Sequence, residues 1–551
     1  MENRYAFTAF RLGRRLANTS KASAWLTPGA ALLLAGALLL SFHLPAAPAA
    51  STAEPQAAAP QGCAGMLPDF TQSTPPADYA GTLPASQTDL AVFAWQHFVA
   101  LSWGASYSPP QNQTRGTPGG GTFFGTGAQP DLTVWQTYRH KNELYRANGA
   151  APDSDYDDPP IYTYNNTTNT NNLPSPCDPK NDTNPSEFIN LDENSQLGLC
   201  YMFAQPSGST APGQVLFLAK LNEANYDYIA SNQLYTRANQ DTYGSVNKAD
   251  LATYGAICQQ TAPTTCAQDV TSSPSAGYCL PCGGTGSEGT IHVKSAWRAL
   301  TTAEASQGRY FTAPVVFYRL TSDSTNVCYT NDTGTTWGLI GLHIIHKTEK
   351  FPAFFFASWE HVDNIASNLT FENTIYGGPT STVGKMLPYQ RASHNGQTLP
   401  SADVQAVNQC VQSTIAANNA SSVWQYYQLV GVQGTPVDYS NYQSDLPNYF
   451  LANNVIESNA FFQSFVGNEA TYSATGTGPE GTTLGVNVNY NGATFDVGGC
   501  QGCHGNAQQG GTDMSFLTAS GSNTTSAEAI GDFENLLSER VKMYLGHVPK
   551  K

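Results

Sequence analysis

The clearest pattern of apolar positions along the chain lies in residues 85–104, ASQTDLAVFAWQHFVALSWG. Three residues recur there at every fourth position, which is the spacing of one face of a helix: Phe93, His97 and Leu101. Ser86 or Thr88 can cap the first turn. We therefore predict a helix over these residues. His97 lies in its apolar stripe, as a buried core histidine or as a residue that contacts a cofactor.

Four later segments are rich in β-branched and aromatic residues and partly alternate with a period of two: 289–300, 309–320, 338–348 and 351–364. Runs of this kind are typical of β-strands. We expect them to be adjacent strands of one antiparallel sheet. Helices are predicted at 131–149, 447–465 and 524–546, and loops rich in Gly, Pro, Asn and Thr separate the elements.

These patterns predict an α+β fold. Residues 76–470 would form a large body around an antiparallel sheet with long loops. A helical, cytochrome c-like C-terminal segment over residues 471–551 would follow the body and pack against it.

Residues 1–49 have the order of an export signal. Basic residues precede the apolar run 29–44, and Ala47-Pro48-Ala49 fits a small-x-small cleavage site. The alternative is an uncleaved anchor, because residues 26–44 are almost long enough to span a bilayer. The small residues that follow favour cleavage, and residues 50–75 are typical of a linker. We expect a periplasmic or secreted protein with no membrane span after signal cleavage.

Charge narrows the range of partners. Only 12 % of the 551 residues are charged, and the formal net charge is −16. Removal of residues 1–49, with five basic residues and one acidic residue, would make it −20. A polyanion repels nucleic-acid phosphates, and no basic patch reverses this, so we expect no nucleic-acid partner. An acidic surface suits a redox partner protein with a basic face.

Eleven cysteines suit an oxidising compartment, in which most would form disulfides. Nine of them lie outside the motif described next, so one of these is unpaired or is paired between chains. Cys279 and Cys282 have the spacing of a thioredoxin-like redox pair. They lie in a Gly- and Ser-rich loop instead of at a strand-to-helix junction. We therefore expect structural disulfides that hold this loop in place.

The strongest chemical signal is GGCQGCHGNAQQGGTDMSF, residues 498–516. Cys500, Cys503 and His504 form C-x-x-C-H, the attachment signature of c-type haem. Two thiols one helical turn apart can reach the two vinyl groups on one edge of a porphyrin, and the adjacent histidine then lies over the iron. The competing interpretation is a disulfide loop with a bystander histidine. We expect one covalently bound haem c.

Through CQGCHG and its flanks, residues 471–551 resemble the c-type cytochromes. The resemblance implies that Cys500 and Cys503 carry the thioethers and that His504 is the proximal iron ligand. Small cytochromes place a distal methionine in a loop before the last helix, and this chain has none there. Three residues after the motif are candidates for the distal ligand: Met514, Met543 and His547. A ligand from the body or an open site is the alternative, with Met514 and Met543 serving only as packing.

A second group of candidate residues lies in GLHIIHKTEKFPAFFFASWEHVDN. On a strand, His343 and His346 point to opposite faces, whereas His346 and His361 could meet on one face of the sheet. Glu360 or Asp363 could orient such a pair. His346, His361 and Glu360 are thus candidates for the acid–base groups of a haem pocket or for a separate metal site. The alternative is that they are buried, hydrogen-bonded residues of the sheet.

The segments HVKSAWRAL and GLHIIHKT also resemble exported bacterial proteins of the cytochrome c family, a group similar to the haem oxygenases that act on unsaturated fatty acids. Those enzymes carry two haem motifs and this chain has one. The favoured function is electron transfer by a monohaem cytochrome. The size of the body favours a haem-dependent oxidoreductase, peroxidase- or oxygenase-like, with a small-molecule or lipid substrate. A surface-binding module with a tethered cytochrome tail is the third possibility.

Overall fold

The structure, a computed structural model, describes most of the chain between residues 61 and 519. The described ranges are 61–152, 155–165, 174–182, 188–196, 200–206, 213–254, 277–284, 286–322, 326–331, 333–365, 369–373, 384–385, 400–434, 453, 455–456, 486–490, 493–497, 500–501, 504–505, 507 and 510–519. The expected helix at 524–546 and most of the one at 447–465 lie outside these residues.

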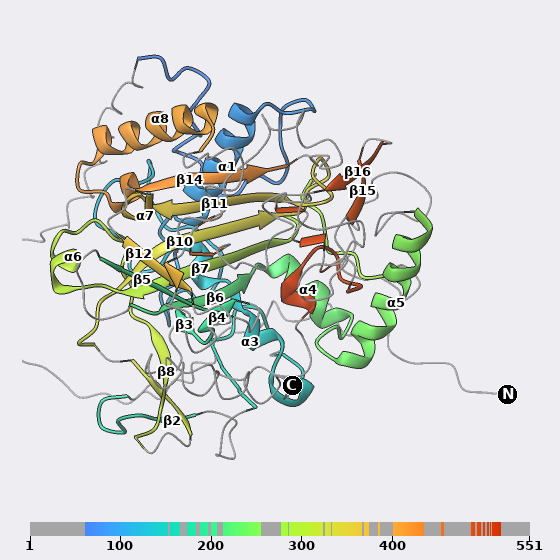
Figure 1. Cartoon of the computed structure of the whole chain (residues 1–551), viewed down its shortest axis with the longest axis horizontal. Coiled ribbons are helices and arrows are strands. Elements are labelled where there is room, and N and C mark those ends of the chain that lie inside the picture. The colour runs from blue at the N-terminus through green and yellow to red at the C-terminus, as the bar shows by residue number, and fades with distance from the viewer. Residues whose placement is uncertain are drawn as a thin grey trace, which may run out of the picture. The chain divides into compact units, whose positions relative to one another are not determined.

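A six-stranded antiparallel sheet runs through the middle of the described chain (Figure 1). Its strands, in spatial order, are β1 (Arg139–His140), β6 (Val215–Leu221), β7 (Ile291–Ala299), β10 (Trp337–His346), β11 (Phe355–His361) and β14 (Tyr427–Gln433). Three of the four segments with alternating residues are β7, β10 and β11, and they are adjacent as predicted. Every residue of β10 and β11 is buried, so both faces of the sheet are covered there.

The predicted helix near residue 90 is confirmed as α1 (Gln87–Leu101). The Ser86 hydroxyl accepts a hydrogen bond from the backbone N–H of Asp89, and the Asp89 carboxylate accepts one from the backbone N–H of Ser86. This reciprocal pair satisfies two backbone donors at the start of the helix. Local sequence alone therefore determines where α1 begins.

A second helix, α8 (Ala402–Asn418), packs beside α1 over the β14 side of the sheet (Figure 1). Trp95 Nε1 of α1 donates to Asn408 Oδ1 of α8 over 3.0 Å, and Asn408 Nδ2 donates to the Leu429 carbonyl of β14 over 2.8 Å. The two helices and the strand share one buried aromatic and aliphatic cluster with the facing residues of β7, β10 and β11. We call this side of the sheet the helix face.

Three smaller sheets complete the strands of the described residues. One contains β4 (Ser195–Gln196), β5 (Cys200–Pro206), β12 (Leu369–Asn373) and β13 (Gly384–Lys385). Another contains β2 (Ser175–Pro176), β3 (Asn190–Leu191), β8 (Val316–Leu320) and β9 (Val327–Thr330). The third pairs β15 (Val486–Tyr490) with β16 (Ala493–Val497).

The prediction that segment 309–320 joins the main sheet is wrong. Its strand, β8, pairs with β9 and β3. Val316 and Tyr318 pack in a separate tyrosine-rich cluster, where the Tyr318 and Tyr164 hydroxyls are 2.9 Å apart. Alternation predicts a strand but not its partners, and here buried tyrosine packing selected a different sheet.

The helix predicted at 131–149 is broken into short pieces. They are α2 (Val134–Thr137), β1, α3 (Lys141–Leu144) and a 3-10 turn (Ala147–Gly149). Arg139 and His140 pair with β6 instead of continuing the helix. The buried Arg139 side chain donates to the Glu143 carboxylate over 2.6 Å and to the Tyr156 carbonyl over 2.9 Å. The Glu143 contact is local, so it is the pairing with β6 and the bond to Tyr156 that outweigh the helical tendency of the segment.

The remaining helices of the described chain are short, apart from α5. They are α4 (Glu223–Ser231), α5 (Arg237–Tyr254), α6 (Thr302–Ser306), α7 (Val362–Ile365), the 3-10 helix η3 (Val423–Tyr426) and α12 (Phe516–Ala519). Sheets that are mostly antiparallel and several helices make a mixed α+β fold, as predicted. Among the described helices, none is long and apolar enough to cross a membrane.

Two disulfides join distant parts of the described chain. Cys63 is bonded to Cys410 of α8, and Cys177 is bonded to Cys328 of β9. Cys279 and Cys282 are also disulfide-bonded. Disulfides at these positions suit a protein folded in an oxidising compartment.

Candidate functional site

The motif segment, residues 500–519, lies against the face of the main sheet opposite α1 and α8. Cys500 and Met514 belong to a hydrophobic cluster with Ile345 of β10 and with Phe354 and Phe356 at β11. We call this side the motif face. Cys503 lies outside the described residues.

Gln501, between the two cysteines of the motif, attaches the segment to the sheet. Its backbone N–H donates to Gln433 Oε1 at the end of β14 over 2.9 Å. Its Nε2 donates to the carbonyls of Ala353 and Phe354, each over 3.3 Å. Because Gln501 is completely buried, these contacts fix the position of the neighbouring Cys500.

Asp513 forms a second attachment. Its carboxylate makes a buried ion pair with Lys347, just after β10, and accepts a hydrogen bond from the Leu280 backbone N–H over 2.8 Å. Asn247 of α5 donates to the Gly511 carbonyl over 2.9 Å. Gly511 has φ +98°, and a Cβ there would lie 2.8 Å from the Gly244 carbonyl oxygen. Glycine is therefore required where the segment crosses α5.

His504 is held in one tautomer. Its Nδ1 is 2.8 Å from the Met514 carbonyl oxygen, which can only accept a hydrogen bond. Nδ1 therefore carries the hydrogen, and Nε2 keeps a lone pair. Metal-binding histidines adopt this arrangement, in which the second ring nitrogen donates to a carbonyl and orients the ring.

Two histidines of the sheet lie on the same face as the motif. His292 of β7 pairs with Ile345, and His343 of β10 is two residues from Ile345. Paired residues and residues two apart on a strand share a face. The rings of His343 and His504 have centroids 6.1 Å apart and planes within 24°. We call His292, His343 and His504 the motif cluster.

Aromatic side chains surround the His504 ring. Its centroid is 4.7 Å from that of Phe356 and 5.1 Å from that of Phe516. His343 Nδ1 is 3.3 Å from the Ser358 hydroxyl. His292 Nε2 is buried and has no hydrogen-bond partner among the described residues. A buried nitrogen without a partner is costly, which marks this position as suited to a ligand.

Burial keeps two members of the cluster neutral. It lowers the pKa of His504 to about 3, helped by the nearby His343. Burial and the same neighbour lower the pKa of His292 to about 3. At neutral pH both rings therefore have a lone pair, which is what a metal ligand requires.

Met514 contacts His504 through its backbone, because its carbonyl accepts the hydrogen bond from His504 Nδ1. Met514 is 2 % exposed and packs in the same cluster as Cys500. This arrangement favours packing as its role. Met543 and His547 lie outside the described residues.

The structure does not bring His346 and His361 together. His346 pairs with Phe355 at one end of the β10–β11 ladder, whereas His361 follows Glu360, which pairs with Gly341 at the other end. Both histidines are completely buried. Glu360 is on the motif face, two residues from Ser358, and is also completely buried. The three candidates therefore do not form one site.

Each of these two histidines has its own partners. The His361 ring stacks on Tyr310 with centroids 3.9 Å apart, and its Nδ1 is 3.5 Å from the Asp363 carboxylate. His346 Nδ1 is 2.8 Å from Nε2 of His97 on α1. The orienting carboxylate that the sequence suggests is thus Asp363, for His361 alone. We call His97 and His346 the helix-face pair.

Within the described residues, no group of three or more His, Cys, Asp or Glu side chains is close enough to hold a metal ion. Of the C-x-x-C-H residues, the structure describes Cys500, which is buried, and His504, which is oriented by its bond to the Met514 carbonyl.

Sequence reasoning missed His292 and the Lys347–Asp513 ion pair. His292 had a signal, because it alternates with apolar residues in IHVKSAW and must face one side of the sheet. Lys347 and Asp513 are 166 residues apart, and no local pattern links them.

Comparison with known proteins gives no match: no family model fits the chain, and no curated protein or solved structure is significantly similar to it.

Proposed function

We propose that this chain is an exported c-type cytochrome that binds one haem through Cys500, Cys503 and His504 and transfers electrons. The observation that carries the proposal is His504 itself, a half-buried neutral imidazole whose Nδ1 donates to a carbonyl and whose Nε2 keeps a lone pair. The C-x-x-C-H sequence adds two thiols at the spacing that thioether attachment needs.

His343 is our candidate for a second residue that would hold the haem. Its ring centroid is 6.1 Å from that of His504 and the two ring planes are within 24°, so the two imidazoles lie next to each other. Ser358, bonded to His343 Nδ1, would orient the ring, as a carbonyl orients His504.

When bound, the haem would supply a one-electron redox couple. His504 would hold it from one side in a fixed tautomer. Phe356, Phe516 and Met514 would exclude water from His504, since these side chains pack around it and around Cys500. Low polarity around a redox centre favours the less charged oxidation state and so tunes its potential.

The test is the visible spectrum of the purified protein, oxidised, reduced, and reduced with carbon monoxide. We expect covalent haem that survives denaturing electrophoresis, with a low-spin spectrum that carbon monoxide does not change. Absence of covalent haem would overturn the assignment. Carbon monoxide binding would exclude His343 as a tight axial ligand while leaving the haem assignment intact.

A haem-dependent oxidoreductase is the second candidate, and His292 is the observation that favours it. Its buried Nε2 has no partner among the described residues, and it lies on the motif face. In an enzyme with an open coordination position, such a histidine could accept or donate a proton. A high-spin oxidised spectrum together with carbon monoxide binding would favour this function over electron transfer.

A further inference from the structure

A lysine of β7, Lys294, lies beside the motif cluster on the motif face. It pairs with His343 across the β7–β10 ladder. Side chains of directly paired residues lie on one face of a sheet, with their Cβ atoms about 4.5–5.5 Å apart. Burial is the main cause of the low pKa of His504, and the positive charge of Lys294 contributes to it. Lys294 is therefore a cation next to the residues that would hold the haem.

The side chain of Lys294 is accessible, in contrast to the sheet histidines beside it. It is 25 % exposed, and its Nζ lies 5.1 Å from the centroid of the Phe217 ring. Lysine side chains often pack their apolar stem on such a surface while the ammonium group stays accessible. An anionic group on the motif face can therefore contact Lys294 without displacing a buried residue.

The ion pairs around Lys294 leave it able to bind a further acceptor. Glu193 lies between two lysines: it makes a close ion pair with Lys141 and a longer one, 3.9 Å between nitrogen and oxygen, with Lys294. A separation of 3.9 Å is too long for a hydrogen bond. An ammonium group has three N–H donors. Lys294 can therefore stay near Glu193 and also donate to a second carboxylate.

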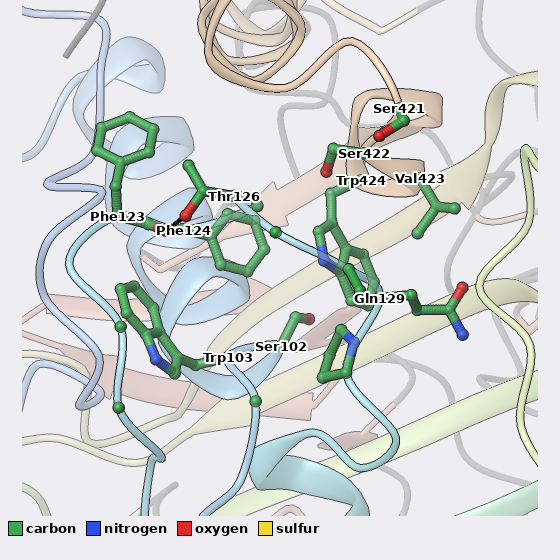
Figure 2. Close-up of a pocket in the computed structure, with 17 residues that line it drawn as sticks. Ser102, Trp103, Phe123, Phe124, Thr126, Gln129, Ser421, Ser422, Val423 and Trp424 are labelled. Carbon is green, nitrogen blue, oxygen red and sulfur yellow. Dashed lines mark hydrogen bonds between the residues drawn. The ribbon is translucent and has the colours of Figure 1, made fainter. Parts of the chain in front are cut away.

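Two other places in the described chain suit a carboxylate less well. Lys347 is 1 % exposed, and Asp513 already pairs with its ammonium group. The cavity beside η3, about 220 Å³ in volume, has no charged residue among the 17 that line it (Figure 2). A carboxylate in that cavity would lose hydration without gaining a counter-charge. Lys294 offers both a charge and access.

The haem itself carries anionic groups that need such a partner. Its two propionate carboxylates lie on the edge opposite the vinyl groups, so thioether attachment leaves them at the far edge. A carboxylate that is moved from water against protein is costly to bury without a counter-charge. The chain has a net charge of −16, which would repel the propionates unless a cation lies beside them.

We propose that Lys294 forms an ion pair with a propionate carboxylate of the haem. This inference rests on the proposed cytochrome function. Lys294 would position the edge of the haem opposite the thioethers, and its charge would offset one negative charge of the haem. Loss of the lysine charge would favour the oxidised haem, which is more positive by one unit, and would lower the reduction potential.

The test is coupling of the haem-loaded protein with a water-soluble carbodiimide, followed by protease digestion and mass spectrometry. The reagent activates a carboxylate, and a lysine amine in contact with it then forms an amide, while the reagent takes up the oxygen and leaves as a urea. We expect the peptide that contains Lys294 to be joined to the haem of peptide 500–504. Coupling of Lys141 to Glu193 in the same digest would show that the reagent reaches this surface.

Three variants separate contact from charge. Lys294→Arg keeps the charge but has no amine to couple, so the haem product should be lost and the reduction potential retained. Lys294→Gln should lose the haem product and also have a lower potential. Lys141→Arg is the matched control, which should lose only its product with Glu193 and keep both the haem product and the potential.

The inference would be overturned if Lys141 couples to Glu193 while Lys294 does not couple to the haem. It would also be overturned if Lys294→Gln has the reduction potential of the wild-type protein. In both cases covalent haem is present, so the cytochrome assignment stands. Absence of covalent haem from the wild-type protein would instead overturn the proposed function, and this inference with it.

Discussion

Strand β10 carries a histidine on each face of the sheet, and the two have different surroundings. His346 faces α1, where it meets His97, and its Nε2 is 2.6 Å from the Glu288 carbonyl. His97 Nδ1 is 2.9 Å from the Phe93 carbonyl, so all four nitrogens of the helix-face pair have a neighbour within hydrogen-bond distance. In the motif cluster, His504 Nε2 keeps its lone pair and His292 Nε2 has no partner among the described residues.

This difference separates a structural histidine from one suited to bind a ligand. The helix-face pair and the two sheet histidines of the motif cluster are buried, aromatic contacts surround both groups, and burial lowers the pKa of members of both. Burial and pKa therefore do not tell the two groups apart. What tells them apart is His292 Nε2, which has no hydrogen-bond partner among the described residues. We accordingly expect changes in the helix-face pair to affect stability and changes in the motif cluster to affect haem chemistry.

The largest effect is expected when both motif thiols are removed. In the double variant Cys500→Ser and Cys503→Ser, no thioether can form, so haem staining after denaturing electrophoresis should disappear completely. His346→Asn is the control from the helix-face pair and should keep the stain. Covalent haem in the double-serine variant would show that the motif is not the attachment site.

The next largest effect concerns the attachment of the motif segment. Asp513→Ala leaves Lys347 charged and buried without its partner, which should lower the free energy of unfolding by about 3–5 kcal/mol in urea titration. The double variant Lys347→Met and Asp513→Leu removes both charges and should recover most of the loss. Equal losses in the single and double variants would mean that the ion pair is not what holds the segment.

A direct comparison of the two faces uses one substitution on each. His346→Phe leaves the Glu288 carbonyl and a nitrogen of His97 without a neighbour, so the free energy of unfolding should fall by about 2–3 kcal/mol, with the visible spectrum unchanged. His343→Phe should instead convert the haem towards high spin and allow carbon monoxide to bind. If the two variants gave the same spectrum, the distinction between the faces would be lost.

The smallest effect is on the pH dependence of stability. Burial lowers the pKa of His97 to about 4, from an ordinary value of 6.5. Below pH 6.5 the unfolded chain therefore binds a proton that the folded chain does not, so stability is lost as the pH falls from 6.5 towards 4. From pH 6.5 to 5.5 the loss should be about 1 kcal/mol for this group, and His97→Phe should remove that share.

Stability that rises as the pH falls would indicate that the helix-face pair binds an extra proton in the folded protein. Two neutral imidazoles carry two N–H groups, whereas the helix-face pair has three contacts to serve. If acid stabilised the wild-type protein relative to His97→Phe, the pair would hold a third proton, and hydrogen bonding would have outweighed burial. Urea unfolding of both proteins at the two pH values distinguishes these cases.

Sequence patterns predicted the elements that are determined by residues close to one another in the chain. The boundaries of α1 follow from Ser86, Asp89 and the apolar stripe, and alternation was sufficient for β7, β10 and β11. Long-range packing decided the rest. Arg139 interrupts the helix because it pairs with Leu221 of β6 and binds the Tyr156 carbonyl, and β8 leaves the main sheet to join buried tyrosines.

For the candidate site, too, the sequence indicated some features and not others. The chemistry proposed for Cys500, Cys503 and His504 rests on five adjacent residues, because thioether attachment requires that spacing. The assignment of His343 and His346 to opposite faces also followed from the strand period. Which face receives the motif depends on Gln501, Lys347 and Asp513, whose partners are far away in sequence. A single sequence carries no signal for contacts of that kind.

The burial of Cys500 constrains the order of events during maturation. Its side chain is 4 % exposed once the motif segment lies on the sheet, and the buried Gln501 next to it closes the approach. Any reaction at this sulfur must therefore come before docking of the segment. The Cys63–Cys410 bond encloses the chain up to α8 and leaves the motif outside that covalent ring. In the proposed cytochrome, the body could thus fold first, haem attachment would follow, and docking of the segment would then bury the modified Cys500 sulfur.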